Sequence, residues 1–154
     1  LMEQVSGRAG RKDKQGRVMI QVAHVSHPVL KFVQQHDYKS FFTFEIDGRQ
    51  RFAYPPFTRL IMLTFRHKMK DVVLSAANAF ADLLKKDFEN YIIGPAEPVI
   101  SRVRNQYLME LLLKLPKDAV LINRVKKSVR HLIAAIHQDR RFRSVVVIAD
   151  VDPV

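Results

Sequence analysis

Residues 58–67 read TRLIMLTFRH, and this alternation of polar and apolar side chains predicts a β-strand with one buried face. That face would carry Ile61, Leu63 and Phe65. Residues 70–88 follow directly, with apolar side chains at the three- and four-residue spacing of an amphipathic helix. A strand followed at once by a helix that can cover it is the start of a sandwich of helices on a sheet.

Further along, the same reasoning predicts three more strands and a second helix. The strands are expected at residues 91–103 (irregular at Gly94-Pro95 and at Pro98), 107–115 and 143–151. Asp118 is placed to cap the helix between the last two. The order β-α-β-β-α-β is typical of the ferredoxin-like sandwich, an α+β fold in which two helices cover one face of a four-stranded antiparallel sheet.

Pro55-Pro56 predicts the boundary between two parts, because neither a helix nor a central strand runs through two consecutive prolines. We therefore expect one part over residues 1–56 and the sandwich over residues 57–154. In the first part, residues 16–25 alternate like a strand, and Pro28 suits the first turn of a helix. Asp37 is placed to cap a further helix, which Gly48 would end.

The composition points to a polyanionic partner. The 154 residues contain 26 Lys and Arg against 15 Asp and Glu, a formal net charge of +11, and such an excess commonly accompanies nucleic-acid binding. The chain has no cysteine, which excludes disulfides, cysteine zinc sites and thiol nucleophiles within it. No apolar run approaches the roughly 20 residues that cross a bilayer, so no membrane partner is expected.

The most informative motif lies at residues 4–11, QVSGRAGR, which reads Q-x-x-G-R-x-G-R. Arg8 and Arg11 are three residues apart, so both guanidinium groups would lie on one side of a helical turn. Such a pair is suited to phosphate oxygens and to the charge that develops during phosphoryl transfer. Gln4 would orient a phosphate oxygen or the attacking water, and Gly7 would allow close approach. The alternative is a basic, glycine-containing loop.

This motif resembles motif VI of superfamily 2 helicases, and the rest of the chain narrows the family. Two later stretches complete the pattern, Tyr54-Pro55-Pro56-Phe57 and Asp150-Val151-Asp152-Pro153. The ordered set is similar to the C-terminal end of the primosomal protein N′ (PriA) family of replication-restart helicases. Ser6 is a small departure, since the family usually has Ala there. Because the chain opens on Leu1 within this motif, we expect a fragment of a longer parent.

The resemblance implies that the parent is an ATP-dependent 3′-5′ DNA helicase of the bacterial cytoplasm and nucleoid. It would recognise stalled forks and direct primosome assembly, with forked and single-stranded DNA, single-stranded-DNA-binding protein and other primosome proteins as partners. Residues 1–56 would be the end of the second RecA-like lobe. Gln4, Arg8 and Arg11 would be catalytic there, with Gly7, Arg8 and Arg11 at the ATP phosphates.

The cofactors of that parent are ATP, Mg²⁺ and zinc, and we expect the residues that hold them to lie elsewhere. Neither a G-x-x-x-x-G-K-[ST] loop nor a DExH box occurs in these 154 residues. The fragment alone is therefore predicted to be inactive as an ATPase. No metal site is expected either, because His24 and His27 have no carboxylate or thiol cluster beside them.

Two basic sets in the second part are candidates for DNA or partner binding. Arg102, Arg104 and Tyr107 stand at the expected turn between the second and third strands, where cations and a ring suit a phosphate backbone with an adjacent base. The other set lies on the second helix opposite its apolar stripe: Arg124, Lys127 and Arg130. The alternative for both sets is an ordinary solvated surface.

Two other functions stay open from the sequence. A free-standing basic ferredoxin-like module of ribosomal or RNA-binding type would explain residues 57–154, but not the arginine motif at residues 4–11. Another superfamily 2 helicase would explain that motif, but not Tyr54-Pro55-Pro56-Phe57 or the terminal Asp150-Val151-Asp152-Pro153.

Overall fold

The computed structural model describes residues 17–153, which divide into two compact units that meet between Gly48 and Arg49. Gln4, Gly7, Arg8 and Arg11 lie outside the described residues. The two units are described separately.

The prediction of a strand at residues 16–25 is wrong for residues 17–25, which form no strand. Val18 and Ile20, whose alternation suggested it, are exposed. The reason is that no other strand exists within residues 17–48 to supply a hydrogen-bonding partner. The helix expected at Pro28 is confirmed as α2 (Pro28–Gln34), and the His27 ring accepts a hydrogen bond from the Val29 N–H at 3.3 Å.

Helix α3 (Tyr38–Arg51) begins as predicted, since the Asp37 carboxylate accepts a hydrogen bond from the Ser40 N–H at 3.0 Å. The predicted end at Gly48 is wrong. Glycine weakens a helix without stopping it, and the helix instead ends where Ala53 turns into the left-handed region at φ 49°. The Tyr54 N–H then donates to the Arg49 carbonyl at 2.7 Å, which completes a Schellman-type end.

The second unit is an antiparallel sheet with two helices. Its elements are β1 (Thr58–His67), α4 (Lys70–Phe88), the 3₁₀ turn η1 (Glu89–Tyr91), β2 (Ile92–Ala96), β3 (Arg102–Val103), β4 (Gln106–Pro116), α5 (Ala119–Gln138) and β5 (Val146–Val151). The strand order is β2-β4-β1-β5, and the short β3 pairs with β4. This α+β arrangement confirms the predicted fold class.

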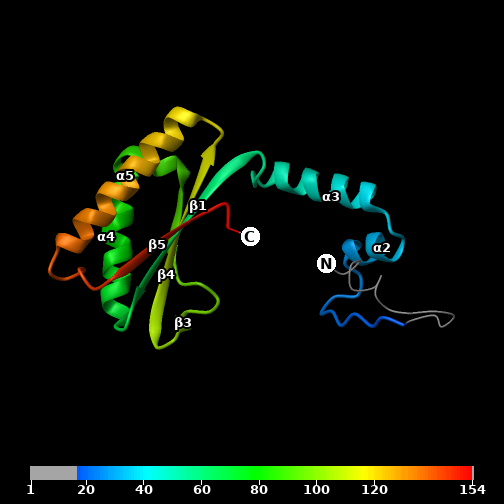
Figure 1. Cartoon of the computed structure of the whole chain (residues 1–154), viewed down its shortest axis with the longest axis horizontal. Helices are drawn as coiled ribbons and strands as arrows, with labels where there is room; N and C mark the ends of the chain where they lie inside the picture. The colour runs from blue at the N-terminus through cyan, green and yellow to red at the C-terminus, as the bar shows by residue number, and fades with distance from the viewer. Residues whose placement is uncertain (1–16, 154) are drawn as a thin grey trace, which may run out of the picture. The chain divides into compact units, whose positions relative to one another are not determined.

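The core lies between the sheet and the two helices, which cover the same face in Figure 1. Ile61, Leu63 and Phe65 are buried there, as their alternation predicted. The Phe65 ring meets Phe80 of α4 edge-on, with centroids 5.3 Å apart. Helix α5 begins at the predicted cap, because the Asp118 carboxylate accepts the Val120 N–H at 2.8 Å.

Two strand boundaries differ from the prediction. The single irregular strand expected at residues 91–103 is two strands, because β2 leaves its register after Ile93 and the chain passes through Gly94 at φ 100°. Proline at position 98 also has no N–H to continue the ladder. The last strand starts at Val146 instead of 143, because residues 139–145 form turns in which the Arg143 N–H donates to the Asp139 carbonyl at 2.9 Å.

Candidate nucleic-acid interface

The predicted turn at residues 101–107 is a β-hairpin between β3 and β4. Arg102 is paired with Tyr107 and Val103 with Gln106, so only Arg104 and Asn105 form the turn. Both have positive φ, 48° and 62°, as a type I′ turn requires. Asparagine tolerates that conformation well, whereas arginine does so at some cost. The turn therefore holds the Arg104 backbone in a defined position at the tip of the hairpin.

Arg102 and Tyr107, predicted together from sequence, are in contact. The Arg102 guanidinium carbon lies 5.0 Å from the centroid of the Tyr107 ring, a cation–π arrangement. The same guanidinium also donates a hydrogen bond to the Asn105 side-chain oxygen. Because two partners hold it, the Arg102 charge is oriented before any ligand arrives, beside a half-exposed ring.

The hairpin shares one end of the sheet with two other connections. His67, the last residue of β1, is the cross-strand partner of Tyr107. On its other side, His67 Nε2 lies 3.0 Å from the Ser144 hydroxyl in the connection between α5 and β5. The β1–α4 turn, the β3–β4 hairpin and the α5–β5 connection therefore meet at neighbouring strand ends.

These three connections gather cations that are distant in sequence. We call the basic end the set Lys68, Arg102, Arg104, Tyr107 and Arg143, of which all but Tyr107 are exposed and positively charged. Within residues 17–153, none of the four cations forms an ion pair with a carboxylate. Sequence reasoning missed Lys68 and Arg143, because single cations on separate connections carry no local pattern.

Two acidic side chains nearby, Glu97 and Asp139, already have cationic partners. Glu97 accepts two hydrogen bonds from Lys70 Nζ at 2.9 and 3.0 Å, which hold the pKa of that carboxyl below its usual value. Asp139 is paired with Arg141 at 2.7 Å, and the hydrogen bond from that guanidinium likewise lowers the pKa of Asp139. Asp71 stands in the first turn of α4, where a negative charge offsets the helix dipole. The basic end keeps a net positive charge.

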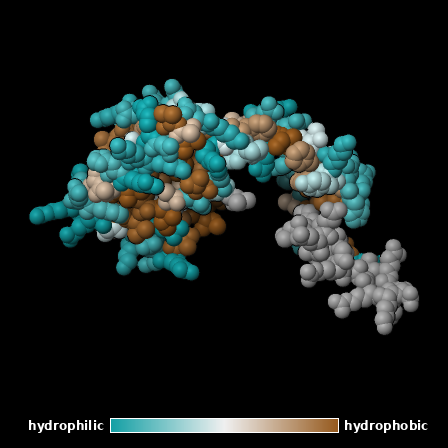
Figure 2. Space-filling view, turned by 45° about the horizontal axis from the view of Figure 1, so that its top comes forward, coloured by the Kyte–Doolittle hydropathy of each residue, from teal (hydrophilic) through white to brown (hydrophobic). Residues whose placement is uncertain are grey.

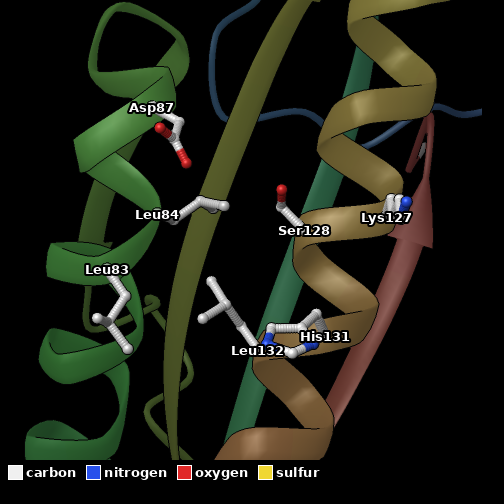
Figure 3. A pocket seen from close by; sticks show the side chains of 7 residues that line it. All are labelled: Leu83, Leu84, Asp87, Lys127, Ser128, His131 and Leu132. Carbon is white, nitrogen blue, oxygen red and sulfur yellow. The ribbon is translucent and has the colours of Figure 1, made fainter.

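The cations predicted on helix α5 do not lie at the basic end. Arg124 lies over the Phe88 ring, with its guanidinium carbon 5.8 Å from the centroid, and Arg130 is exposed. Lys127 lies at a groove between α4 and α5 (Figure 3). Helix α5 covers the face of the sheet, whereas the hairpin lies at its end (Figure 1).

The groove has an apolar floor with polar sides and a volume of about 300 Å³. Its lining comes from Leu83, Leu84 and Asp87 of α4 and from Lys127, Ser128, His131 and Leu132 of α5. In Figure 3 the leucine side chains extend into the space between the two helices, with Asp87 at one end. The groove carries one lysine and one carboxylate, so an acidic and apolar ligand would have to meet Lys127 and the leucines at the end away from Asp87.

Neither a metal site nor a membrane-spanning helix is found within the described residues. No cluster of three or more His, Asp or Glu side chains in residues 17–153 is placed to hold a metal ion. Over the same residues, no helix has both the length and the apolar character that a bilayer crossing needs. The arrangement is therefore suited to binding through cations, one exposed ring and an apolar groove.

Comparison with known proteins shows the family to which the chain belongs. Residues 50–154 match the family model of the primosomal protein N C-terminal domain. The chain belongs to this family. The match covers the whole sandwich and the turn that leads into it, so the PriA C-terminal domain is the unit that carries both the basic end and the groove.

Three similar proteins are each named "Replication restart protein PriA". The one from Treponema pallidum is 36% identical over all of this chain and 23% of its own length. The one from Bacillus subtilis is 31% identical over 99% of this chain and 19% of its own length. The one from Synechocystis is 35% identical over 82% of this chain and 16% of its own length. The chain thus spans about a fifth of the length of these relatives.

Proposed function

We propose that this chain is part of an ATP-dependent 3′-5′ DNA helicase that recognises stalled replication forks and directs primosome assembly during replication restart. The similarity to replication restart proteins over nearly the whole chain supports this. Arg8 and Arg11 act as arginine fingers and Gln4 as the motif glutamine. ATP, Mg²⁺ and zinc are bound by other parts of the parent.

A free-standing nucleic-acid-binding module of the same fold is the weaker alternative. It accounts for the sandwich and its charge. It does not account for the similarity to replication restart proteins, which includes the residues that precede the sandwich.

The basic end is the observation that carries the proposal for this domain. DNA phosphates are attracted to cations whose charge is not already neutralised, and Lys68, Arg104 and Arg143 meet that condition within the described residues. Tyr107 adds a ring on which a base stacks, next to the oriented Arg102 guanidinium. We infer that the PriA C-terminal domain binds DNA at the basic end of its sheet.

Fluorescence anisotropy with labelled forked and single-stranded DNA tests this role. We expect micromolar, salt-sensitive binding that weakens about tenfold in Arg102→Ala/Arg104→Ala, with a shallower salt dependence. Lys85→Ala/Lys86→Ala is the matched control, because it removes the same charge from the last turn of α4. Equal losses in the two double variants would show that only net charge matters and would contradict a defined site.

The groove between α4 and α5 supports a second partner, the acidic tail of single-stranded-DNA-binding protein. Such a tail needs a cation beside an apolar notch, which Lys127 and the leucines provide. A labelled peptide of that tail should bind the chain, and Lys127→Glu should weaken it at least about tenfold by reversing the charge. The control is Lys117→Glu, the same charge reversal outside the groove. Equal weakening in both variants would contradict docking there.

A further inference from the structure

The loop between β2 and β3, residues 97–101, presents apolar side chains to solvent. Val99 is fully exposed and Ile100 is 69% exposed. Single exposed aliphatic residues are common on protein surfaces. Two adjacent ones at the tip of a loop leave a larger apolar surface in contact with solvent after folding. We call Val99 and Ile100 the apolar tip.

The loop is fastened at both of its ends. Before the tip, Glu97 accepts two hydrogen bonds from Lys70 Nζ, at 2.9 and 3.0 Å, which tie it to the start of α4. After the tip, the Ser101 carbonyl accepts a hydrogen bond from the Leu108 N–H at 2.9 Å. Only three residues lie between these two attachments. The loop is therefore short and held in place, and the tip stays outside the core.

The apolar tip lies beside the basic end. Arg102 follows Ile100 by two residues, and Arg104 stands at the turn of the same hairpin. Figure 2 shows that this unit exposes hydrophobic as well as hydrophilic surface. Arginine is common in protein–protein interfaces too, but the exposed cations beside the tip have no carboxylate partner within residues 17–153, which favours a polyanionic occupant. Cations beside apolar groups match a polyanion that also offers apolar faces, which is DNA with exposed bases.

We propose that the apolar tip packs against the exposed face of a base at a junction between duplex and single-stranded DNA, while Arg102 and Arg104 hold the flanking phosphates. Within a duplex the base faces are covered by stacking, but at a junction the last pair and the first unpaired base expose theirs. Aliphatic side chains inserted at such steps partly unstack bases. This inference rests on the proposed recognition of forked DNA and goes further, because it assigns Val99 and Ile100 as the residues that select the junction.

A forked DNA with 2-aminopurine at the junction tests the proposal, because the fluorescence of this base rises when it unstacks. We expect the 154-residue chain to raise the signal at the junction about twofold and to leave an interior duplex position unchanged. Val99→Ser/Ile100→Ser should abolish the rise and reduce the preference for forked over single-stranded DNA about fivefold. Its affinity for single-stranded DNA, measured by anisotropy, should stay within about twofold, because the phosphate contacts remain.

Val120→Ser is the matched control, because Val120 is 71% exposed at the start of α5, away from the hairpin. An unchanged 2-aminopurine signal in Val99→Ser/Ile100→Ser would overturn the inference and leave the DNA-binding proposal standing. So would a wild-type chain that binds DNA without any signal at the junction. Failure to bind any DNA at low salt would overturn both proposals. Circular dichroism of each variant confirms that the fold is kept.

Discussion

Leu60 and Asp152 exchange two hydrogen bonds across 92 residues of chain. The Leu60 N–H donates to Asp152 Oδ1 at 2.9 Å, and the Asp152 N–H donates to the Leu60 carbonyl at 3.0 Å. The other carboxylate oxygen pairs with Arg59, and Asp152 takes a positive φ of 52° to reach both partners. This exchange fastens the residue after β5 to the start of β1, so it closes the sheet at the end opposite the hairpin.

Asp152→Ala should therefore lower the free energy of unfolding by about 1–3 kcal/mol, because it leaves a half-buried N–H without its acceptor. Urea denaturation followed by circular dichroism measures the change. Asp150→Ala is the control, since Asp150 is exposed on the preceding strand and should cost little. Equal losses in both variants would show that the exchange contributes nothing.

The same carboxylate gives stability a pH dependence. Burial acts to raise the pKa of Asp152, but the Leu60 N–H bond and the Arg59 guanidinium outweigh it, so the pKa lies below the ordinary 3.8. A carboxyl whose folded pKa is lowered stabilises the fold above its unfolded pKa, and that stabilisation is lost as pH falls through the folded value. Asp152→Asn, which keeps an acceptor but not the charge, should be less stable than wild type at about pH 6, and the difference should shrink as the pH falls below 3.8 and through the lowered pKa of Asp152. Denaturation curves across this range would refute the assignment if the difference stayed constant.

Two glycines should respond in opposite directions to the same substitution. Gly94 has φ 100°, and a Cβ there would lie 3.0 Å from the Glu110 carbonyl oxygen. Gly94→Ala should destabilise the sheet by at least about 1–2 kcal/mol, because the left-handed conformation and the backbone contact both oppose it. Gly48→Ala meets nothing within 4 Å inside α3 and should raise helix stability by about 0.5–1 kcal/mol. Thermal denaturation of both variants tests the pair, and the same sign for both would contradict this account.

The contact between Phe65 and Phe80 predicts a large loss in the core. Both rings are fully buried, so Phe80→Ala should cost about 3–5 kcal/mol through lost apolar burial and the cavity it leaves. Leu74→Ala on the same helix is the control, because Leu74 is 41% exposed and should cost under about 1 kcal/mol. Chemical denaturation compares the two, and a small loss for Phe80→Ala would mean that this core is not the one that stabilises the unit.

The 154-residue chain should hydrolyse no ATP on its own. It has neither the G-x-x-x-x-G-K-[ST] loop nor the DExH box that hold the nucleotide and its metal. A phosphate-release assay with single-stranded DNA present measures this. Any turnover that persists in Arg11→Ala is contamination, whereas turnover that this variant abolishes would contradict the prediction.

The elements of the second unit could be predicted because their signals are local. The residues 58–67 and 70–88 that the pattern assigned to a strand and a helix have those bounds in the structure, and Asp118 caps α5. The predictions that failed depend on partners. Residues 17–25 alternate like a strand but have no strand to pair with among residues 17–48. Residues 91–103 divide into two strands, and only the pairing with β4 shows where the register breaks.

The sequence by itself determined the charge excess, the order of strands and helices, and the placing of two arginines and a tyrosine at one turn. These properties follow from composition and from short-range periodicity, and they do not depend on how distant segments pack together. Only the tertiary structure decided that Lys68 and Arg143 join that hairpin, and that Glu97 and Asp139 beside them are already paired. A binding surface is defined by distances in space, and those follow from strand order and register across the sheet, which connect residues far apart in the chain.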